Sequence, residues 1–156
     1  SLSKRSNLPG LRSGFVAGDA TLIQEFRRYR TYHGCAMPIH HQVASIAAWS
    51  DEAHVLENRA LYRAKFDSVH DVLAPSLNTY IPEAGFYLWP NTPTSDIEFT
   101  RTLLEQTNVA VLPGSYLGRE VDGRNPGSGH VRMALVATHQ ETLEAAERIA
   151  HFMRRG

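Results

Sequence analysis

The chain has 156 residues and a mass of 17.4 kDa, about the size of one domain. Its composition, 42% hydrophobic and 21% charged, is that of a globular protein and argues against a disordered chain. Sixteen basic residues balance sixteen acidic ones, so no broad electric field favours nucleic acid or an anionic membrane as a partner. The single Cys35 excludes an internal disulfide, and the longest apolar runs are far shorter than the ~20 residues of a membrane helix. No signal-peptide pattern opens the chain, so we expect a cytoplasmic protein.

The first half of the chain predicts one strand and three helices. Residues 14–18 form a short apolar run between two glycines, which is typical of a buried strand. The segments that follow repeat apolar residues at helical spacing, and the second of them is apolar on almost every side, which predicts a buried helix. Cys35 is also expected to be buried. The helices are expected over residues 19–32, 38–49 and 51–73.

The second half predicts a small layer of helices packed against a short sheet. Its apolar runs are short and end at Pro or Gly, as strands do, and a loop rich in Gly and Asn connects the last two. Because the strand at residues 14–18 has no obvious partner, we expect its sheet to include strands upstream of Ser1. The later strands are expected over residues 85–89, 109–112 and 131–136, and helices are expected from Ser95 or Asp96 and from about Gln140.

Residues 1–14, here called the lysine segment, carry the most specific pattern in the chain. The segment resembles the lysine signature of the class I/II aminotransferases, which depend on pyridoxal phosphate and have fold type I. That signature consists of a small hydroxylated residue, a reactive Lys three positions later, an Arg eight after the Lys, and a Gly two further on. Ser1, Lys4, Arg12 and Gly14 match it, whereas Ser13 stands where the family prefers a small aliphatic residue.

Chemistry explains why these residue types are needed. An aldehyde cofactor needs a primary amine to hold it as an imine, and Lys alone supplies one on a side chain. A phosphate group favours the planar, permanently charged guanidinium of Arg, and a hydroxyl can complete its shell. The resemblance therefore implies pyridoxal 5'-phosphate as the cofactor, Lys4 as the catalytic Schiff-base lysine, and Ser1 and Arg12 as phosphate contacts.

A second match lies at residues 127–135, which resemble the C-terminal strand whose Arg binds the substrate α-carboxylate in this family. Arg132 lies within an otherwise apolar run, where a charge needs a partner. A carboxylate would supply two parallel hydrogen bonds. The alternative for Arg132 alone is a structural salt bridge to a local acid. No set of Cys and His residues has the spacing of a zinc site, so no metal is expected.

The resemblance covers essentially the whole chain and implies an α/β protein, specifically the C-terminal part of the fold type I transferases. Residues 1–50 would be the end of the large cofactor-binding domain, residues 51–74 the inter-domain helix, and residues 75–156 the small C-terminal domain. The chain begins at Ser1 without Met, and the other cofactor contacts of the family lie upstream of its lysine. We therefore expect a C-terminal segment that does not catalyse transamination by itself.

Within the family, the amino-acid sequences of residues 1–7, 14–19 and 29–34 resemble those of the N-succinyldiaminopimelate aminotransferase subfamily. That resemblance implies transfer of an amino group between glutamate and N-succinyl-2-amino-6-oxopimelate, in the biosynthesis of lysine and diaminopimelate. It also implies a homodimer. The alternatives are an aminotransferase of the aspartate, alanine or aromatic type, a fold type I lyase, and a catalytically inactive fragment with a binding role.

Overall fold

The structure is a computed structural model that describes residues 1–155. The chain divides into two compact units, Ser1–Arg59 and Ala60–Gly156, and the boundary lies within the long helix α4 (Ala53–Leu73). The finer division at residues 50 and 74 stays a prediction. Across the described residues, no helix is both long enough and apolar enough to cross a membrane.

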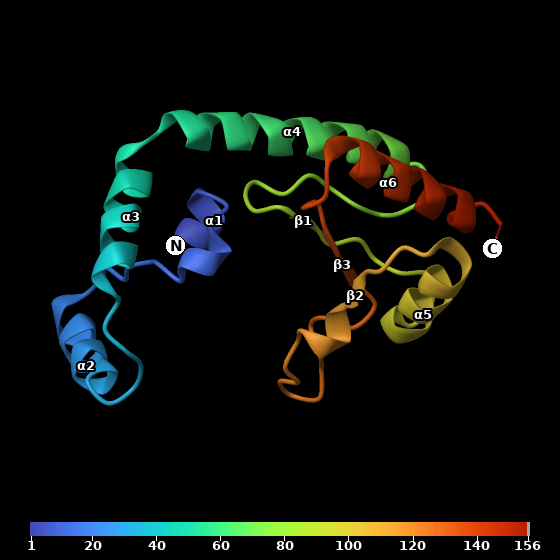
Figure 1. Ribbon diagram of the computed structural model, residues 1–156. Helices are drawn as coiled ribbons and strands as arrows, with labels where there is room; N and C mark the ends of the chain where they lie inside the picture. The colour runs from blue at the N-terminus through green and yellow to red at the C-terminus, as the bar shows by residue number, and fades with distance from the viewer. Residues whose placement is uncertain (156) are drawn as a thin grey trace. The chain divides into compact units, whose positions relative to one another are not determined.

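The first unit is built from short and medium helices (Figure 1). They are α1 (Leu2–Arg5), the 3-10 helix η1 (Pro9–Leu11), α2 (Ala20–Arg30), α3 (Ile39–Ser50) and the start of α4. The three longer helices confirm the sequence predictions within a few residues. Asp19 begins α2 as expected, because its carboxylate accepts hydrogen bonds from the N–H groups of Thr21 and Leu22.

Three expectations for the first unit are wrong. Residues 14–18 form no strand, and Phe15 and Val16 are 70% and 63% exposed, because no second strand of the described chain lies beside them. Helix α3 buries only Ser45, since a helix that is apolar on every side needs more neighbours than this unit provides. Cys35 is exposed rather than buried, because it lies in the irregular segment between α2 and α3.

The second unit is a three-stranded antiparallel sheet with helices packed on it. Its elements are β1 (Tyr87–Leu88), α5 (Asp96–Thr107), β2 (Leu112–Pro113), the 3-10 helix η2 (Gly114–Tyr116), β3 (Val131–Ala134) and α6 (His139–Met153). The sheet has the order β1-β3-β2, so the last strand lies in the middle. Figure 1 shows α6 beginning near the end of α4, where the Nε2 of His139 lies 3.0 Å from the Ser68 hydroxyl. Both helices and the strands expected at residues 85–89 and 131–136 are confirmed, although these strands are shorter than predicted. The strand expected over residues 109–112 is shifted, because β2 begins at Leu112 and includes Pro113, where the strand was expected to end.

The core of the second unit joins the sheet to its helices. Leu88 from β1, Phe99 and Leu103 from α5, and Val131 from β3 are almost completely inaccessible to solvent. Burying a side chain of this size contributes about 1.5–3 kcal/mol relative to leaving it exposed. Alternate residues of β3 face this core, so Arg132 and Ala134 lie on the opposite face of the sheet.

Asp96 is a buried carboxylate in the first turn of α5, with a relative exposure of 4%. Its two oxygens accept hydrogen bonds from the N–H of Ser115 (2.8 Å) and the N–H of Gly129 (3.3 Å). Burial alone would raise the pKa of Asp96, but the hydrogen bonds from Ser115 and Gly129 outweigh it and lower the pKa. The ionised carboxylate therefore stabilises the folded state.

We predict that Asp96→Asn lowers thermal stability at neutral pH and that this deficit shrinks in acid. A carboxyl whose pKa is lowered in the folded state contributes stability above its unfolded pKa and loses it as pH falls through the folded pKa, here below about 3.8. Thermal unfolding from pH 7 to pH 3 measures the effect. Glu98→Gln is the matched control, since it removes an exposed carboxylate from the same helical turn. A constant gap between wild type and Asp96→Asn at every pH would contradict the prediction.

Candidate functional site

The two ends of the lysine segment meet in the structure. The N–H of Leu2 donates to the carbonyl of Ser13 at 3.0 Å, which closes the segment. Gly14 then lies against Ser1 so closely that a Cβ at position 14 would be 3.3 Å from the Ser1 Cα. The glycine of the signature therefore has a packing reason, because a larger residue would crowd the hydroxyl-bearing residue at the other end.

Lys4 lies in the short helix α1. The Ser1 hydroxyl accepts from the N–H of Ser3 and so caps this helix. Leu2 is fully buried, while the Lys4 side chain is on the exposed side. A four-residue helix is not stable alone, so contacts of its neighbours must hold Lys4 in place.

Arg5 supplies those contacts by binding the end of α3. Its guanidinium donates to the carbonyl of Ala48 at 2.7 Å, pairs with Glu52, and lies 5.0 Å from the centre of the Trp49 ring. The side chain of Arg5 is 15% exposed, so these interactions are partly shielded from water. Arg5 therefore anchors α1, the helix that carries Lys4, to the end of α3.

Ser13 has a structural reason for departing from the aliphatic preference of the signature. Its hydroxyl lies 2.7 Å from the hydroxyl of Ser45 in α3, and Ser45 in turn donates to the carbonyl of His41. Both serines are buried, with exposures of 5% and 7%. The pair ties the far end of the lysine segment to α3. Nothing in the sequence distinguishes Ser45, because a serine within a helix is usually solvated.

Arg12 follows η1 in a left-handed conformation, with φ 50° and ψ 36°. This region is uncommon for residues other than glycine and is often found where function or packing requires it. The exposed side chain of Arg12 turns back, and Nη1 donates to the carbonyl of Pro9 at 2.9 Å. Arg12 thus keeps most of its donors available for a ligand.

The residues of the lysine segment fit pyridoxal phosphate chemically. Lys4 offers a primary amine, Ser1 a hydroxyl and Arg12 a guanidinium, which are the groups that an aldehyde with a phosphate group needs. The backbone closure at Leu2 and Ser13 holds the residues that carry them in one compact segment. Ser1, Lys4 and Arg12 are therefore the residues that could hold the cofactor.

Arg132 lies in the second unit, on the face of β3 away from the core. Its guanidinium carbon is 4.6 Å from the centre of the Tyr87 ring, a cation–π contact across the β1–β3 pair. The buried Nε of Arg132 has no hydrogen-bond partner, and no carboxylate within residues 1–155 forms an ion pair with this side chain. The salt bridge that the sequence left open as an alternative is therefore absent from the described chain. A half-buried guanidinium that forms no ion pair with the described residues is suited to bind an anionic ligand.

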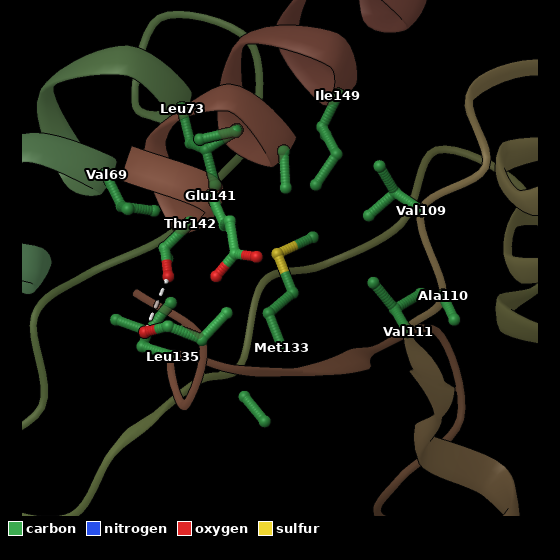
Figure 2. Close-up of a pocket in the computed structure, with 14 residues that line it drawn as sticks. Val69, Leu73, Val109, Ala110, Val111, Met133, Leu135, Glu141, Thr142 and Ile149 are labelled. Atoms are coloured by element: carbon green, nitrogen blue, oxygen red, sulfur yellow. Dashed lines mark hydrogen bonds between the residues drawn. The ribbon is translucent and has the colours of Figure 1, made fainter. Parts of the chain in front are cut away.

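An apolar pocket in the second unit lies between α4, α6 and the sheet (Figure 2). Its volume of about 120 Å³ is well below the ~300–1,000 Å³ of ordinary ligand sites. Glu141 is its charged lining residue, and that carboxylate already accepts hydrogen bonds from Thr138 in the cap of α6. We therefore do not assign chemistry to this pocket. Within the described residues, no group of His, Cys, Asp and Glu could hold a metal ion.

Comparison with known proteins identifies the family. The sequence profile described as Aminotransferase class I and II matches residues 1–149. The chain therefore belongs to the class I and II aminotransferase family, whose cofactor is pyridoxal 5'-phosphate and whose fold is type I.

Particular relatives agree with this assignment. The chain is 33% identical over 154 residues to a protein named as a probable aminotransferase from Mycobacterium tuberculosis, covering 96% of this chain and 34% of the relative. It is similar to the crystal structure of an aminotransferase from Neisseria meningitidis, with a TM-score of 0.89 and 52% identity over 99% of this chain and 39% of the other. A structure named as a probable N-succinyldiaminopimelate aminotransferase, from Thermus thermophilus, matches with a TM-score of 0.81 and 32% identity over 97% of this chain and 40% of the other. The chain thus spans between a third and two fifths of these relatives.

We predict that Ser45→Val destabilises the protein, because the Ser13 hydroxyl then loses its buried partner. Leaving such a group unsatisfied costs about 1–3 kcal/mol. The double variant Ser13→Ala with Ser45→Ala removes both hydroxyls and should recover most of that loss, since no buried donor remains unpaired. Thermal unfolding of the two variants and wild type measures the difference. Equal loss in the single and double variants would show that the hydroxyl pair does not matter.

Proposed function

We propose that this chain provides the cofactor lysine and the substrate-binding arginine of a pyridoxal-phosphate aminotransferase. The observation that carries the proposal is the closed lysine segment, in which backbone contacts hold Ser1, Lys4 and Arg12 together with the glycine that the signature requires. The membership of the chain in the aminotransferase family supports the same function. The unpaired Nε of Arg132 supports its role as the carboxylate ligand.

Each residue then has a distinct task. The bound cofactor supplies an electron sink for negative charge at the substrate α-carbon. Arg12 and Ser1 bind the phosphate and so fix the position of the ring. The amine of Lys4 would hold the cofactor at rest, and once freed it would take the proton from the substrate α-carbon and deliver it to the former aldehyde carbon of the cofactor. Arg132 binds the α-carboxylate in two parallel hydrogen bonds and so fixes the orientation of the substrate.

We propose a diaminopimelate-type substrate with glutamate as the amino donor. The similarity of residues 1–7, 14–19 and 29–34 to the N-succinyldiaminopimelate aminotransferase subfamily favours N-succinyl-2-amino-6-oxopimelate as the acceptor, and the Thermus relative bears the corresponding name. A second candidate is a reaction in which LL-diaminopimelate is the amino donor, or the product of the reverse reaction, since a protein named LL-diaminopimelate aminotransferase from Natranaerobius thermophilus is 32% identical over 97% of this chain. Assays with N-succinyl-2-amino-6-oxopimelate as acceptor and with LL-diaminopimelate as donor to 2-oxoglutarate separate the two, and an aspartate, alanine or aromatic donor tests the remaining alternatives.

We further propose that the activity belongs to the full-length encoded protein acting as a cytoplasmic homodimer. The chain covers 34% of the Mycobacterium relative and 39% of the Neisseria structure, so residues 1–156 alone should not transaminate. Failure of the full-length protein to bind pyridoxal phosphate would favour an inactive binding role. Formation of an elimination product without a 2-oxo acid from glutamate would favour a lyase.

The lysine assignment can be tested by chemical labelling. Lys4 and Lys65 are the two lysines of the chain, and the Lys65 amine donates to the carbonyls of Leu135 and Ala137. We predict that borohydride reduction in the presence of pyridoxal phosphate adds one cofactor mass to the full-length protein, at Lys4. Lys4→Ala should abolish this adduct and turnover, while Lys65→Arg should leave both unchanged. Peptide mapping by mass spectrometry locates the adduct, and an adduct that persists in Lys4→Ala would refute the assignment.

The arginine assignment can be tested by kinetics. We predict that Arg132→Ala weakens binding of L-glutamate by roughly 2–5 kcal/mol, because the buried part of the site then lacks the partner of the carboxylate. The effect should appear mainly in KM. Arg101→Ala, which removes an exposed arginine of α5, is the control. An unchanged KM for L-glutamate in Arg132→Ala would count against the assignment.

A further inference from the structure

A carboxylate of α5, that of Asp96, binds the backbone just before the start of β3, the strand that carries Arg132. Strands β2 and β3 pair at Leu112 with Arg132 and at Pro113 with Val131. The ladder continues one step further, where the N–H of Gly114 donates to the carbonyl of His130 at 2.8 Å. In the same register, the next two residues to face each other are Ser115 and Gly129.

Asp96 occupies that next step of the ladder. Its two carboxylate oxygens bind the N–H groups of Ser115 and Gly129, one each. Strand β2 turns into η2 at Gly114, so these two N–H groups do not bond to the opposite strand there. The Asp96 carboxylate therefore joins the ends of both strands. The two residues that it binds, Ser115 and Gly129, lie equally far along the chain from Leu112 and from Arg132, respectively.

The backbones near this point pack too closely for side chains to adjust. A Cβ on Gly114 would lie 2.2 Å from the carbonyl oxygen of Gly127, and a Cβ on Gly127 would lie 2.0 Å from that of Gly114. The Asn125 amide adds a bond to the carbonyl of Ser115 at 2.8 Å and one from the N–H of Gly127 at 2.9 Å. Because these segments meet backbone to backbone, a shift at the Asp96 end is transmitted to β3 rather than absorbed.

We propose that Asp96 is a positioning residue for Arg132, which fixes the register and spacing of β3 so that the guanidinium is presented in one place. The inference rests on the proposed role of Arg132 in binding the substrate carboxylate. Two parallel hydrogen bonds to a carboxylate tolerate little displacement of the fork. The contact of Arg132 with Tyr87 restrains the guanidinium from the β1 side, and Asp96 restrains the strand from the β2 side.

Asp96→Asn is the direct test, in the full-length protein with pyridoxal phosphate and with L-glutamate as the varied substrate. The asparagine presents one acceptor oxygen and one NH₂ group, so one of the two backbone N–H groups faces a donor. We expect KM for L-glutamate to rise about tenfold with kcat within about twofold of wild type, which is the pattern of lost binding rather than lost chemistry. The borohydride adduct at Lys4 should form normally. Glu98→Gln, on the same turn of α5, should behave as wild type.

A double-mutant cycle with Arg132→Lys shows whether Asp96 acts through Arg132. If it does, Asp96→Asn changes KM less than about threefold in the Arg132→Lys background. An equal rise in both backgrounds, or no rise with Asp96→Asn while Arg132→Lys raises KM, would overturn the inference and leave the proposed function standing. No rise with Arg132→Lys itself would overturn the role of Arg132 and the inference with it.

A second variant keeps the test valid if Asp96→Asn does not fold. Asp96→Glu retains the charge and displaces the carboxylate by one methylene, and it should raise KM by a smaller factor than Asp96→Asn. Hydrogen exchange at the N–H groups of Ser115 and Gly129 gives a readout that does not depend on activity. Faster exchange at both groups in either variant is expected, and unchanged exchange in the folded variant would refute the positioning role of Asp96.

Discussion

The candidate site depends on one backbone hydrogen bond, from the N–H of Leu2 to the carbonyl of Ser13. It closes the lysine segment, so residues that are eleven positions apart in sequence lie against each other. The four-residue helix α1 would not persist without such tertiary contacts. The buried Leu2 side chain, the Arg5 guanidinium and the Ser13–Ser45 pair all act on this closed segment. Lys4 is thus an exposed residue in a segment that is anchored on both sides of it.

In the second unit, the positively charged Arg132 lies within the otherwise apolar strand β3. Val131 and Met133 face the core, and Arg132 between them faces outward over Tyr87. The strand itself is paired on both sides, and a buried carboxylate bridges the end of one of these pairings. The two charged groups near this strand thus differ. The Asp96 carboxylate binds backbone N–H groups, whereas the buried Nε of Arg132 has no hydrogen-bond partner in the described residues.

The sequence predicted the family, because the spacing of Ser1, Lys4, Arg12 and Gly14 is long and specific, and the family assignment confirms it. It also predicted the regular helices, since caps such as Asp19 and stripes such as that of α4 are local signals. The prediction of a strand at residues 14–18 was wrong, because a strand is buried only where other strands lie beside it, and the sequence of the segment itself does not show whether they do. Arg5, Ser45 and Asp96 were missed for a related reason. Their roles arise from contacts with residues 19 to 47 positions away in sequence, and no spacing rule marks them.

The most direct test of the account is a crystal structure of the full-length encoded protein grown with pyridoxal phosphate. We expect electron density that is continuous between the Lys4 Nζ and the cofactor, with the phosphate bound by Arg12 and the Ser1 hydroxyl. Cofactor density joined to another residue, or a phosphate bound away from Arg12, would contradict it.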